Sequence, residues 1–352
     1  MNKQTIWRWI VTIVVLAAAG VLFLYPIDYY VKKPGDAYDA KEYIDVEDKD
    51  RDDIGKFQFT TVSVMKATPF LYAMATVLPN QEVVQRSEML QEEEDENEYK
   101  VRQLKLMDHS KFNALRVAFE QADLPYTVRF DGVQVLNVLK DSAADDVLVP
   151  GDMIVEINGE LIESIEKLGE SLEGKSEGDK VELVIQQNQE LVTKEITLKE
   201  IPNTDGKIGL GVTYSEQKKI QTDPHVDMNT EDIGGPSAGL MFTLEILNQL
   251  LDEDLTKGYI VAGTGTINEN GTVGRIGGID KKVIAADKAG ASYFLAPDDE
   301  LPAEALARNP HIKTNYEEAL EAIKKIDTTM EVVPVKTIDD AMVFLNNLPP
   351  KD

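Results

Sequence analysis

An apolar run near the N-terminus constrains this chain more than any other feature. Residues Ile10 to Tyr25 contain no charged side chain and are almost wholly apolar. Extended from Ile6 to Ile27, the run reaches the minimum of about 17 residues that a helix needs to span a bilayer. Aromatic residues flank it, as they do at the two surfaces of a membrane: Trp7 and Trp9 precede it, and Tyr25, Tyr29 and Tyr30 lie at its far end. We therefore predict that residues 1–34 form a cytoplasmic stub and a transmembrane anchor.

The same run also fits a secretory signal peptide, in which basic residues precede an apolar stretch and a small-residue cleavage site. Lys3 and Arg8 supply the basic residues, and Ala17 to Ala19 supply the small ones. Strongly apolar residues continue beyond these alanines, which favours a retained anchor. Lys32 and Lys33 follow the run, so that basic residues are nearly balanced across it. The order of basic residues and then apolar run favours an N-terminus inside the cell. We therefore predict a single-pass protein of the cell membrane with its later domains outside the cytoplasm.

Composition narrows the chemistry of those domains. The 352 residues suggest two or three folded units, which we predict to form an α+β multidomain protein. The formal net charge is −27, which repels phosphate backbones and argues against a nucleic-acid partner. Cysteine is absent, which excludes disulfide scaffolds, Cys-ligated metals and thiol nucleophiles. Only three histidines are present, so we predict neither a metal site nor a cofactor: they are His109, His225 and His311.

Residues 35–126 show no chemical motif. Phe57 to Val64 is rich in β-formers and predicts a strand. Lys111 to Gln121 places Phe112, Leu115 and Phe119 on one helical face. We predict a structural adaptor here.

Residues 127–201 carry a sharper pattern. The run from Leu148 to Gly159 combines a Pro-Gly-Asp turn, an apolar strand and an Asn-Gly hairpin signal. A helix over residues 162–172 and a last pair of strands follow. This layout resembles a bacterial PDZ domain.

The resemblance implies capture of an extended peptide, often a chain end, by addition of a strand. The order of the elements predicts that the receiving strand consists of Val133, Gln134, Val135, Leu136, Asn137 and Val138. The alternative is a small β-rich spacer whose groove is not used.

One motif match in the same region does not predict its usual function. Residues Gly169 to Ser176 satisfy the phosphate-loop pattern GxxxxGK[ST]. That loop needs a strand before it and a helix after it, so that helix N–H groups face the phosphate. Here the predicted order is helix and then strand, and Glu170 and Glu173 would repel phosphate. We therefore predict no nucleotide site.

The chemistry lies in residues 203–348, where Ser237 stands in a glycine-rich turn before a long apolar helix. Helix N–H groups beside a serine can stabilise an oxyanion. A plain N-cap serine is the simple alternative. The turn also satisfies GxSxG, the nucleophile elbow of α/β-hydrolases. That reading would need His311 as the base, but His311 lies in a polar segment and no apolar strand precedes the turn.

A lysine supplies a different base. The segment that opens at Gly277 predicts a helix on which Ile279, Val283 and Ala286 share one face. Lys282 falls at the edge of that face, whereas Lys281 falls nearly opposite, towards water. Burial disfavours the ammonium form, so Lys282 can become a neutral amine and activate a serine.

Three motifs then give a resemblance. They are GGPSAGL at 234–240, AGTGTI at 262–267 and GRIGGIDKK at 274–282. In order and spacing they resemble the proteolytic domain of Lon proteases. With the anchor and the PDZ-like region, the chain resembles the membrane-anchored PDZ/Lon-type serine proteases of Gram-positive bacteria.

The resemblance implies roles for single residues. Ser237 corresponds to the nucleophile and Lys282 to the base of a Ser–Lys dyad. Thr264 corresponds to a threonine that helps to orient the lysine, and Gly235 and Pro236 frame the serine. Many Lon proteins carry an acid at the position of Gly234, which leaves the role of such an acid open here.

These observations predict an ATP-independent serine endopeptidase that cleaves extended secreted or membrane-tethered peptides and proteins at the outer face of the membrane. The PDZ-like region would capture the substrate, and no nucleotide would take part. Lon-type domains tend to form rings, so the resemblance also implies a homo-oligomer of unfixed number. Two alternatives stay open: a PDZ scaffold with an inactive Lon-like domain, and a Ser-His esterase that uses His311.

Overall fold

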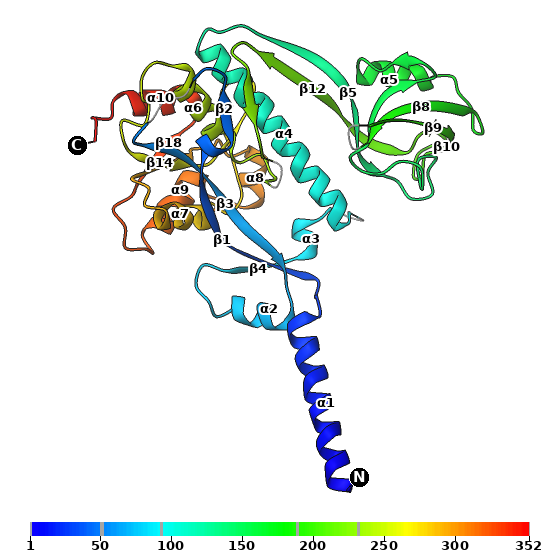
Figure 1. Cartoon of the computed structure of the whole chain (residues 1–352), viewed down its shortest axis with the longest axis horizontal. Helices are drawn as coiled ribbons and strands as arrows, with labels where there is room; N and C mark the ends of the chain where they lie inside the picture. Colours follow the sequence, from blue (N-terminus) through cyan, green and yellow to red (C-terminus); the bar gives the residue numbers. More distant parts are fainter. Residues whose placement is uncertain (1, 50–52, 92–93, 188–189, 231–232, 352) are drawn as a thin grey trace. The chain divides into compact units, whose positions relative to one another are not determined.

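The computed structural model describes residues 2–49, 53–91, 94–187, 190–230 and 233–351, and the chain forms two compact units (Figure 1). Unit 1 joins Met1–Tyr43, Arg51–Glu93 and Ser237–Asp352. Unit 2 joins Ile44–Asp50 and Glu94–Pro236. Both contain helices and strands, as predicted for an α+β protein. The predicted adaptor, residues 35–126, is divided between the two units.

The apolar run forms helix α1, Lys3–Leu24, none of whose residues is buried. By length and composition α1 can cross a membrane, a criterion that an anchor and a signal sequence both meet.

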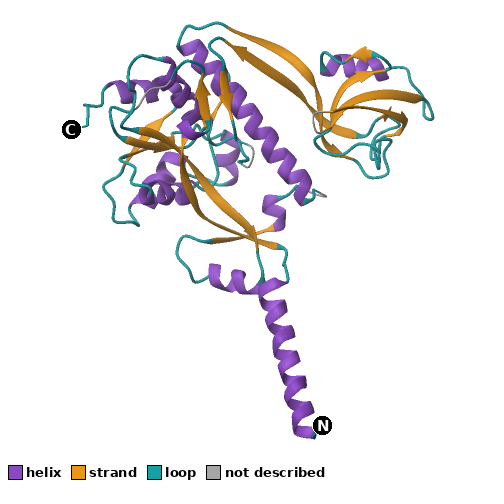
Figure 2. Cartoon of the chain, viewed as in Figure 1, coloured by secondary structure: helices purple, strands orange, loops and turns teal. Residues whose placement is uncertain are grey.

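A six-stranded sheet organises unit 1 (Figure 2). Strands from the two ends of the chain meet in its middle, where β3 runs parallel to β14. The N-terminal strands therefore complete the sheet of the C-terminal region instead of forming a separate adaptor. In order across the sheet the strands are β18 (Glu331–Val335), β17 (Tyr293–Pro297), β14 (Ile260–Gly263), β3 (Lys56–Lys66), β1 (Tyr29–Asp39) and β4 (Glu82–Gln85).

Two helices of unit 1 position the residues of interest. Helix α6, Gly239–Leu250, is apolar on nearly all sides and buried along its whole length. Its Phe242 ring meets Phe59 of β3 edge-on, with 5.2 Å between centroids. Helix α7, Ile279–Lys288, buries the predicted apolar face in a core shared with β14, β17 and helix α9. The smaller elements of the unit are η1 (Ala40–Glu42), α2 (Pro69–Ala75), α3 (Arg86–Met89), β15 (Thr266–Ile267), β16 (Val273–Gly274), α8 (Ala303–Arg308), α9 (Asn315–Ile323) and α10 (Ile338–Asn346).

Unit 2 combines a long helix with a second sheet. Helix α4, Glu96–Gln121, begins with a capping box between Asp95 and Glu98. The predicted hairpin is confirmed, because Asn158 and Gly159 both have positive φ between β6 and β7. The order of the main sheet strands is β12 (Val212–Thr222), β5 (Tyr126–Val138), β6 (Met153–Ile157), β8 (Lys180–Gln187) and β9 (Glu190–Thr197). The remaining elements are β2 (Ile44–Val46), β7 (Glu160–Leu161), α5 (Ile165–Leu172), β10 (Lys199–Glu200), β11 (Ile208–Gly209) and β13 (Val226–Met228).

Candidate active site

Ser237 and Lys282 lie in hydrogen-bond contact in unit 1. Ser237 stands two residues before α6, and Lys282 lies in the first turn of α7. The distance from Lys282 Nζ to Ser237 Oγ is 2.6 Å. The two residues that the sequence selected as nucleophile and base are thus adjacent, although 45 positions separate them.

Two further oxygens fix the direction of the lysine amine. Lys282 Nζ donates to the backbone oxygen of Thr60 at 2.8 Å and contacts Thr264 Oγ1 at 3.0 Å. Thr264 Oγ1 donates its own proton to the Ser237 carbonyl at 2.9 Å, so it must accept from the lysine. A neutral amine has two N–H groups and one lone pair. With both N–H groups engaged, its lone pair points at the Ser237 hydroxyl.

Burial favours the neutral form of the Lys282 amine. Lys282 is 3% exposed, and desolvation lowers the pKa of its amine to about 7. Desolvation is the only cause of this shift. The predicted effect of the apolar helix face is therefore present, and near neutral pH a large fraction of the lysine can accept a proton.

The neighbouring lysine corrects a prediction. We expected Lys281 to face water, but it is only 4% exposed. Its Nζ contacts Glu82 Oε2 at 2.7 Å and Asp280 Oδ2 at 3.1 Å. Desolvation lowers its pKa, but the hydrogen bond with Glu82 and the charge of Asp280 outweigh it, so the pKa of Lys281 is raised. Glu82 comes from strand β4, and the periodicity of one helix cannot reveal such a neighbour.

Hydrogen bonds on both sides hold the serine turn. After the turn, the Ser237 carbonyl also accepts from Gly265 N–H at 2.9 Å. Before it, Gly235 N–H donates to the Gln103 carbonyl at 2.8 Å, and Ser110 Oγ donates to the Pro236 carbonyl at 3.0 Å. Gly235 has φ +92°, a conformation that favours glycine. Helix α4 of unit 2 thus holds the segment that leads directly into Ser237.

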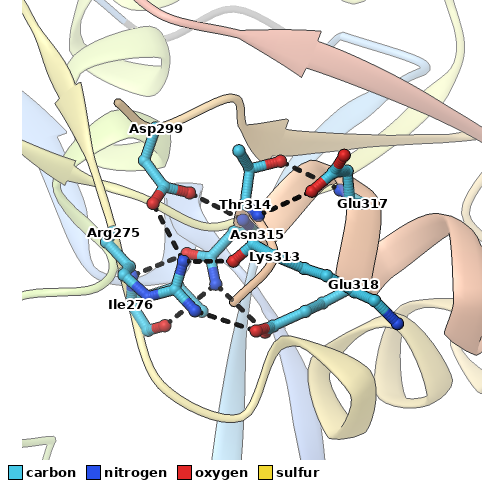
Figure 3. A network of polar contacts seen from close by, with 8 residues as sticks. All are labelled: Arg275, Ile276, Asp299, Lys313, Thr314, Asn315, Glu317 and Glu318. Carbon is cyan, nitrogen blue, oxygen red and sulfur yellow. Dashed lines mark hydrogen bonds and ion pairs between the residues drawn. The ribbon is translucent and has the colours of Figure 1, made fainter. Parts of the chain in front are cut away.

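A polar network holds the segment before α7 (Figure 3). The Arg275 guanidinium contacts Asp299 at 2.9 Å and Glu318 at 2.8 Å. Asn315 accepts from Ile276 N–H at 2.7 Å and donates back to the Ile276 carbonyl at 3.1 Å. Asn315 is fully buried, so this network fixes the point at which the chain enters the helix that carries Lys282.

A second candidate site is a groove of about 690 Å³ in unit 2. One wall is α5 with the loop that follows it, and the other runs from Gly206 to Tyr214 at the start of β12. Leu168, Leu172 and Leu210 line it, and Glu166 and Glu170 stand among its polar residues.

The pairing of the strands beside the groove bears on which strand could receive a peptide. Strand β5 pairs with β12 along one edge from Tyr126 to Val138, and with β6 at Val133 and Gln134 along the other. An added peptide needs an open strand edge. Of the predicted receiving residues, Val133 and Gln134 are paired on both edges, whereas Val135, Asn137 and Val138 have a ladder partner only in β12 and Leu136 lies at a register shift; the choice of β5 as the receiving strand stays a prediction. Among the described strands of this sheet, β12 is the edge strand that borders the groove.

Two family models match the chain. The model of the Lon protease (S16) C-terminal proteolytic domain matches residues 207–344, and the PDZ domain model matches residues 105–198. The chain combines a PDZ domain with a Lon-type proteolytic domain. The PDZ sheet extends past its matched residues into β12, and the sheet of the Lon-type domain includes β1 and β3, which lie outside the matched residues.

Several proteins resemble parts of the chain. The Lon protease of Azospirillum brasilense is 28% identical over 194 residues, which are 53% of this chain and 20% of that protein. The Lon protease of Phenylobacterium zucineum is 34% identical over 133 residues, which are 38% of this chain and 15% of that protein. The chain thus spans a fifth or less of the length of these relatives. The crystal structure of the PDZ domain of an SdrC-like protein from Listeria monocytogenes is 33% identical, with a TM-score of 0.24, and covers 25% of this chain and 92% of that domain.

Among the described residues, the other candidate groups make no hydrogen bond with the Ser237 or Lys282 side chains. The His311 side chain is exposed, and its backbone N–H donates to Asn309 Oδ1. The phosphate-loop match at Gly169 to Ser176 lies after the start of α5 and before β8, the order that the sequence predicted. In the described part of the chain, His, Cys, Asp and Glu form no cluster that could hold a metal.

Sequence reasoning missed Thr60. Its contribution to the Lon-type site is a backbone carbonyl, which any residue type could supply. Only the parallel pairing of β3 with β14 brings it to Lys282. No local sequence signal marks it.

The packing of α4 explains the absence of an acid at position 234. A Cβ on Gly234 would lie 2.8 Å from Gln103 Cβ, which is closer than real side chains approach. Gln103 Cβ is bonded directly to the backbone of a long helix, so it can move aside only if the helix moves. Any side chain at this position would displace α4 from the serine turn.

We expect Gly234→Ala to lower the free energy of unfolding by about 1–3 kcal/mol, as other overpacked positions do. Chemical denaturation of the full chain in detergent measures the change. Gly277→Ala is the matched control, because a Cβ there meets no atom within 4 Å. Equal stability of the two variants would contradict the steric explanation for glycine at 234.

Proposed function

We propose that the chain is a serine endopeptidase in which Ser237 is the nucleophile and Lys282 the general base. The observation that carries the proposal is the 2.6 Å contact between a largely buried lysine amine and a serine hydroxyl. The Lon-type domain match supports a peptidase reaction.

The proposed reaction conserves protons at each step. Lys282 Nζ takes the Ser237 proton while Ser237 Oγ bonds to the substrate carbonyl carbon. The resulting ammonium protonates the leaving nitrogen as the C–N bond breaks, which leaves an acyl-serine. Water then attacks the acyl carbon, Lys282 takes its proton, and that proton returns to Ser237. Backbone N–H groups at the start of α6 are the proposed oxyanion donors.

We also propose that cleavage needs no ATP and favours flexible substrates. The purified full chain is incubated with one polypeptide in its folded and unfolded forms, each with and without ATP. We expect cleavage of the unfolded form alone, at a rate that ATP does not change. A peptide boronic acid, which bonds to an activated serine, should block it. No cleavage under any condition would favour the scaffold alternative.

The PDZ groove is the proposed site of substrate capture, with the peptide added along the outer edge of β12. We expect Gly169→Trp to fill this groove, because a Cβ at Gly169 meets no atom within 4 Å and the position lines the groove. KM for a long PDZ-binding substrate should rise about tenfold, the equivalent of about 1.4 kcal/mol. Cleavage of a short peptide should stay unchanged.

The control for this variant is Thr193→Trp. Thr193 is exposed on β9, at the opposite edge of the sheet, and is not among the residues that line the groove. An equal rise of KM in both variants, or a loss of short-peptide cleavage in Gly169→Trp, would speak against capture in the groove.

We further propose that α1 is retained as an anchor and that both domains lie outside the cytoplasm. Two observations support retention: none of the residues of α1 is buried, and its last turn packs on α2. Digestion of intact cells with an added protease tests the orientation, because only an extracytoplasmic domain would be degraded.

A further inference from the structure

The segment from Ala67 to Gln81 contains no charged residue, although 28% of the chain is charged. It forms α2 and the loop that leads to β4. Four large apolar or aromatic side chains in it are exposed, and the most exposed is Val77 at 75%. The others are Phe70, Tyr72 and Leu78.

The inner face of α2 is packed, so the outer face is not needed for the core. Leu71 and Ala75 pack in a cluster with Val31 and Ala67. Thr68 caps the helix, accepting from Leu71 N–H at 3.3 Å. The exposed side chains are therefore presented by a helix that is already held in place.

The outer face lies at the end of the apolar helix. The Phe70 ring contacts the Phe23 ring in the last turn of α1, with 4.6 Å between centroids. The Tyr72 ring meets Tyr29 edge-on at 5.0 Å. Figure 1 shows α2 beside the end of α1 from which β1 begins. If α1 spans a bilayer, α2 begins where the chain leaves the hydrocarbon.

We propose that α2 and the loop over residues 76–79 insert into the bilayer surface beside α1. Aromatic and aliphatic side chains are stable at the boundary between headgroups and acyl chains, without any charge attraction. The net charge of −27 makes an electrostatic attachment to anionic lipids unfavourable, which leaves apolar contact as the means. The lipid contact continues the surface of α1, so the inference rests on the proposed anchor.

The consequence is a fixed placement of the Lon-type domain. Strands β3 and β4 flank the inserted segment, and both belong to the sheet that carries the site. The domain would then be held at the membrane by two adjacent elements instead of one swivelling helix. Substrates that lie close to the bilayer are favoured by this arrangement.

Single cysteines test the proposal, because the chain has none of its own. A polarity-sensitive fluorophore is attached at Val77→Cys or Leu78→Cys in the full chain, reconstituted in vesicles of neutral lipid. Leu16→Cys in α1 reports the anchor. Val343→Cys is the matched exposed control, on α10 next to the opposite edge of the sheet.

We expect lipids with a spin label near the headgroup to quench the fluorophore at 77 and 78 about twofold or more, as for a side chain in the interface. The label at 343 should not change. Lipids with a spin label in the acyl chain should quench the fluorophore at 16, and this quenching without headgroup-lipid quenching at 77 or 78 would overturn the surface insertion alone. No quenching at 16 by the acyl-chain label would overturn the anchor and the insertion with it. A blue shift at 77 that spin-labelled lipids do not quench would indicate a protein partner and also overturn the proposal.

Discussion

Ser237→Ala and Lys282→Met are each expected to lower kcat/KM for an unfolded substrate at least about a thousand-fold, because nucleophile and base act as one unit. Without Ser237 no acyl-serine can form. Without Lys282 no group accepts the serine proton, since the other two partners of the amine are a backbone carbonyl and a threonine hydroxyl. Initial rates on an unstructured peptide measure both effects, and the double variant should be no worse than either single one.

Lys281→Met is the control for Lys282→Met, because Lys281 is also a buried lysine of helix α7. It loses contacts with Glu82 and Asp280, which are half-exposed carboxylates that water can solvate. We therefore expect activity within about threefold of the wild type, since Met fills the buried space of Lys281 and the released carboxylates stay in contact with water. Activity above a tenth of the wild type in Lys282→Met, or an equal loss in Lys281→Met, would contradict the assignment of the base.

The activity of the wild type is expected to rise with pH as a single ionisation with its midpoint near pH 7. The lowered pKa of Lys282 sets this midpoint, because only the neutral amine can accept the serine proton. Below the midpoint, kcat/KM should fall about tenfold for each pH unit, so that at pH 5 it is about a hundredfold below its plateau. Lys282→Arg should be inactive throughout, because a guanidinium keeps its proton.

The same ionisation makes the free energy of unfolding depend on pH. The ordinary pKa of lysine is 10.5, and in the folded chain burial lowers that of Lys282 to about 7. Between these values the unfolded chain binds the proton and the folded chain does not, so stability rises with pH across this window. Lys282→Met should remove that rise. A pH profile that keeps its midpoint near 7 in a Lys282 variant but loses it in His311→Ala would support the esterase alternative.

Local pattern together with the resemblance to Lon proteolytic domains selected Ser237 and Lys282 as the proposed dyad. The apolar face formed by Ile279, Val283 and Ala286 sets the burial of Lys282, and that face can be read from one helix. The glycine-rich turn marks Ser237 in the same way. Their contact requires only that α6 and α7 pack on one sheet.

Partners contributed by distant strands could not be predicted in this way. Thr60 Oγ1 donates to the Gly263 carbonyl, 203 positions away along the chain. Parallel pairing over such a distance leaves no local periodicity, and so β1 and β3 looked like an adaptor. The misplacement of Lys281 has the same origin, because its neighbour Glu82 comes from β4. In the PDZ domain, a strand pattern identifies β5 but cannot show that β12 occupies its edge.

The pairing of β3 with β14 also determines when the chain can become active. Thr60 emerges early from the ribosome, whereas Ser237, Thr264 and Lys282 emerge only after the whole PDZ domain. Long-range parallel contacts form slowly, because the intervening chain must first be ordered. The edge of β3 that pairs with β14 therefore stays unpaired while unit 2 is synthesised. During this interval the proposed site is not assembled, so a half-made chain cannot use it.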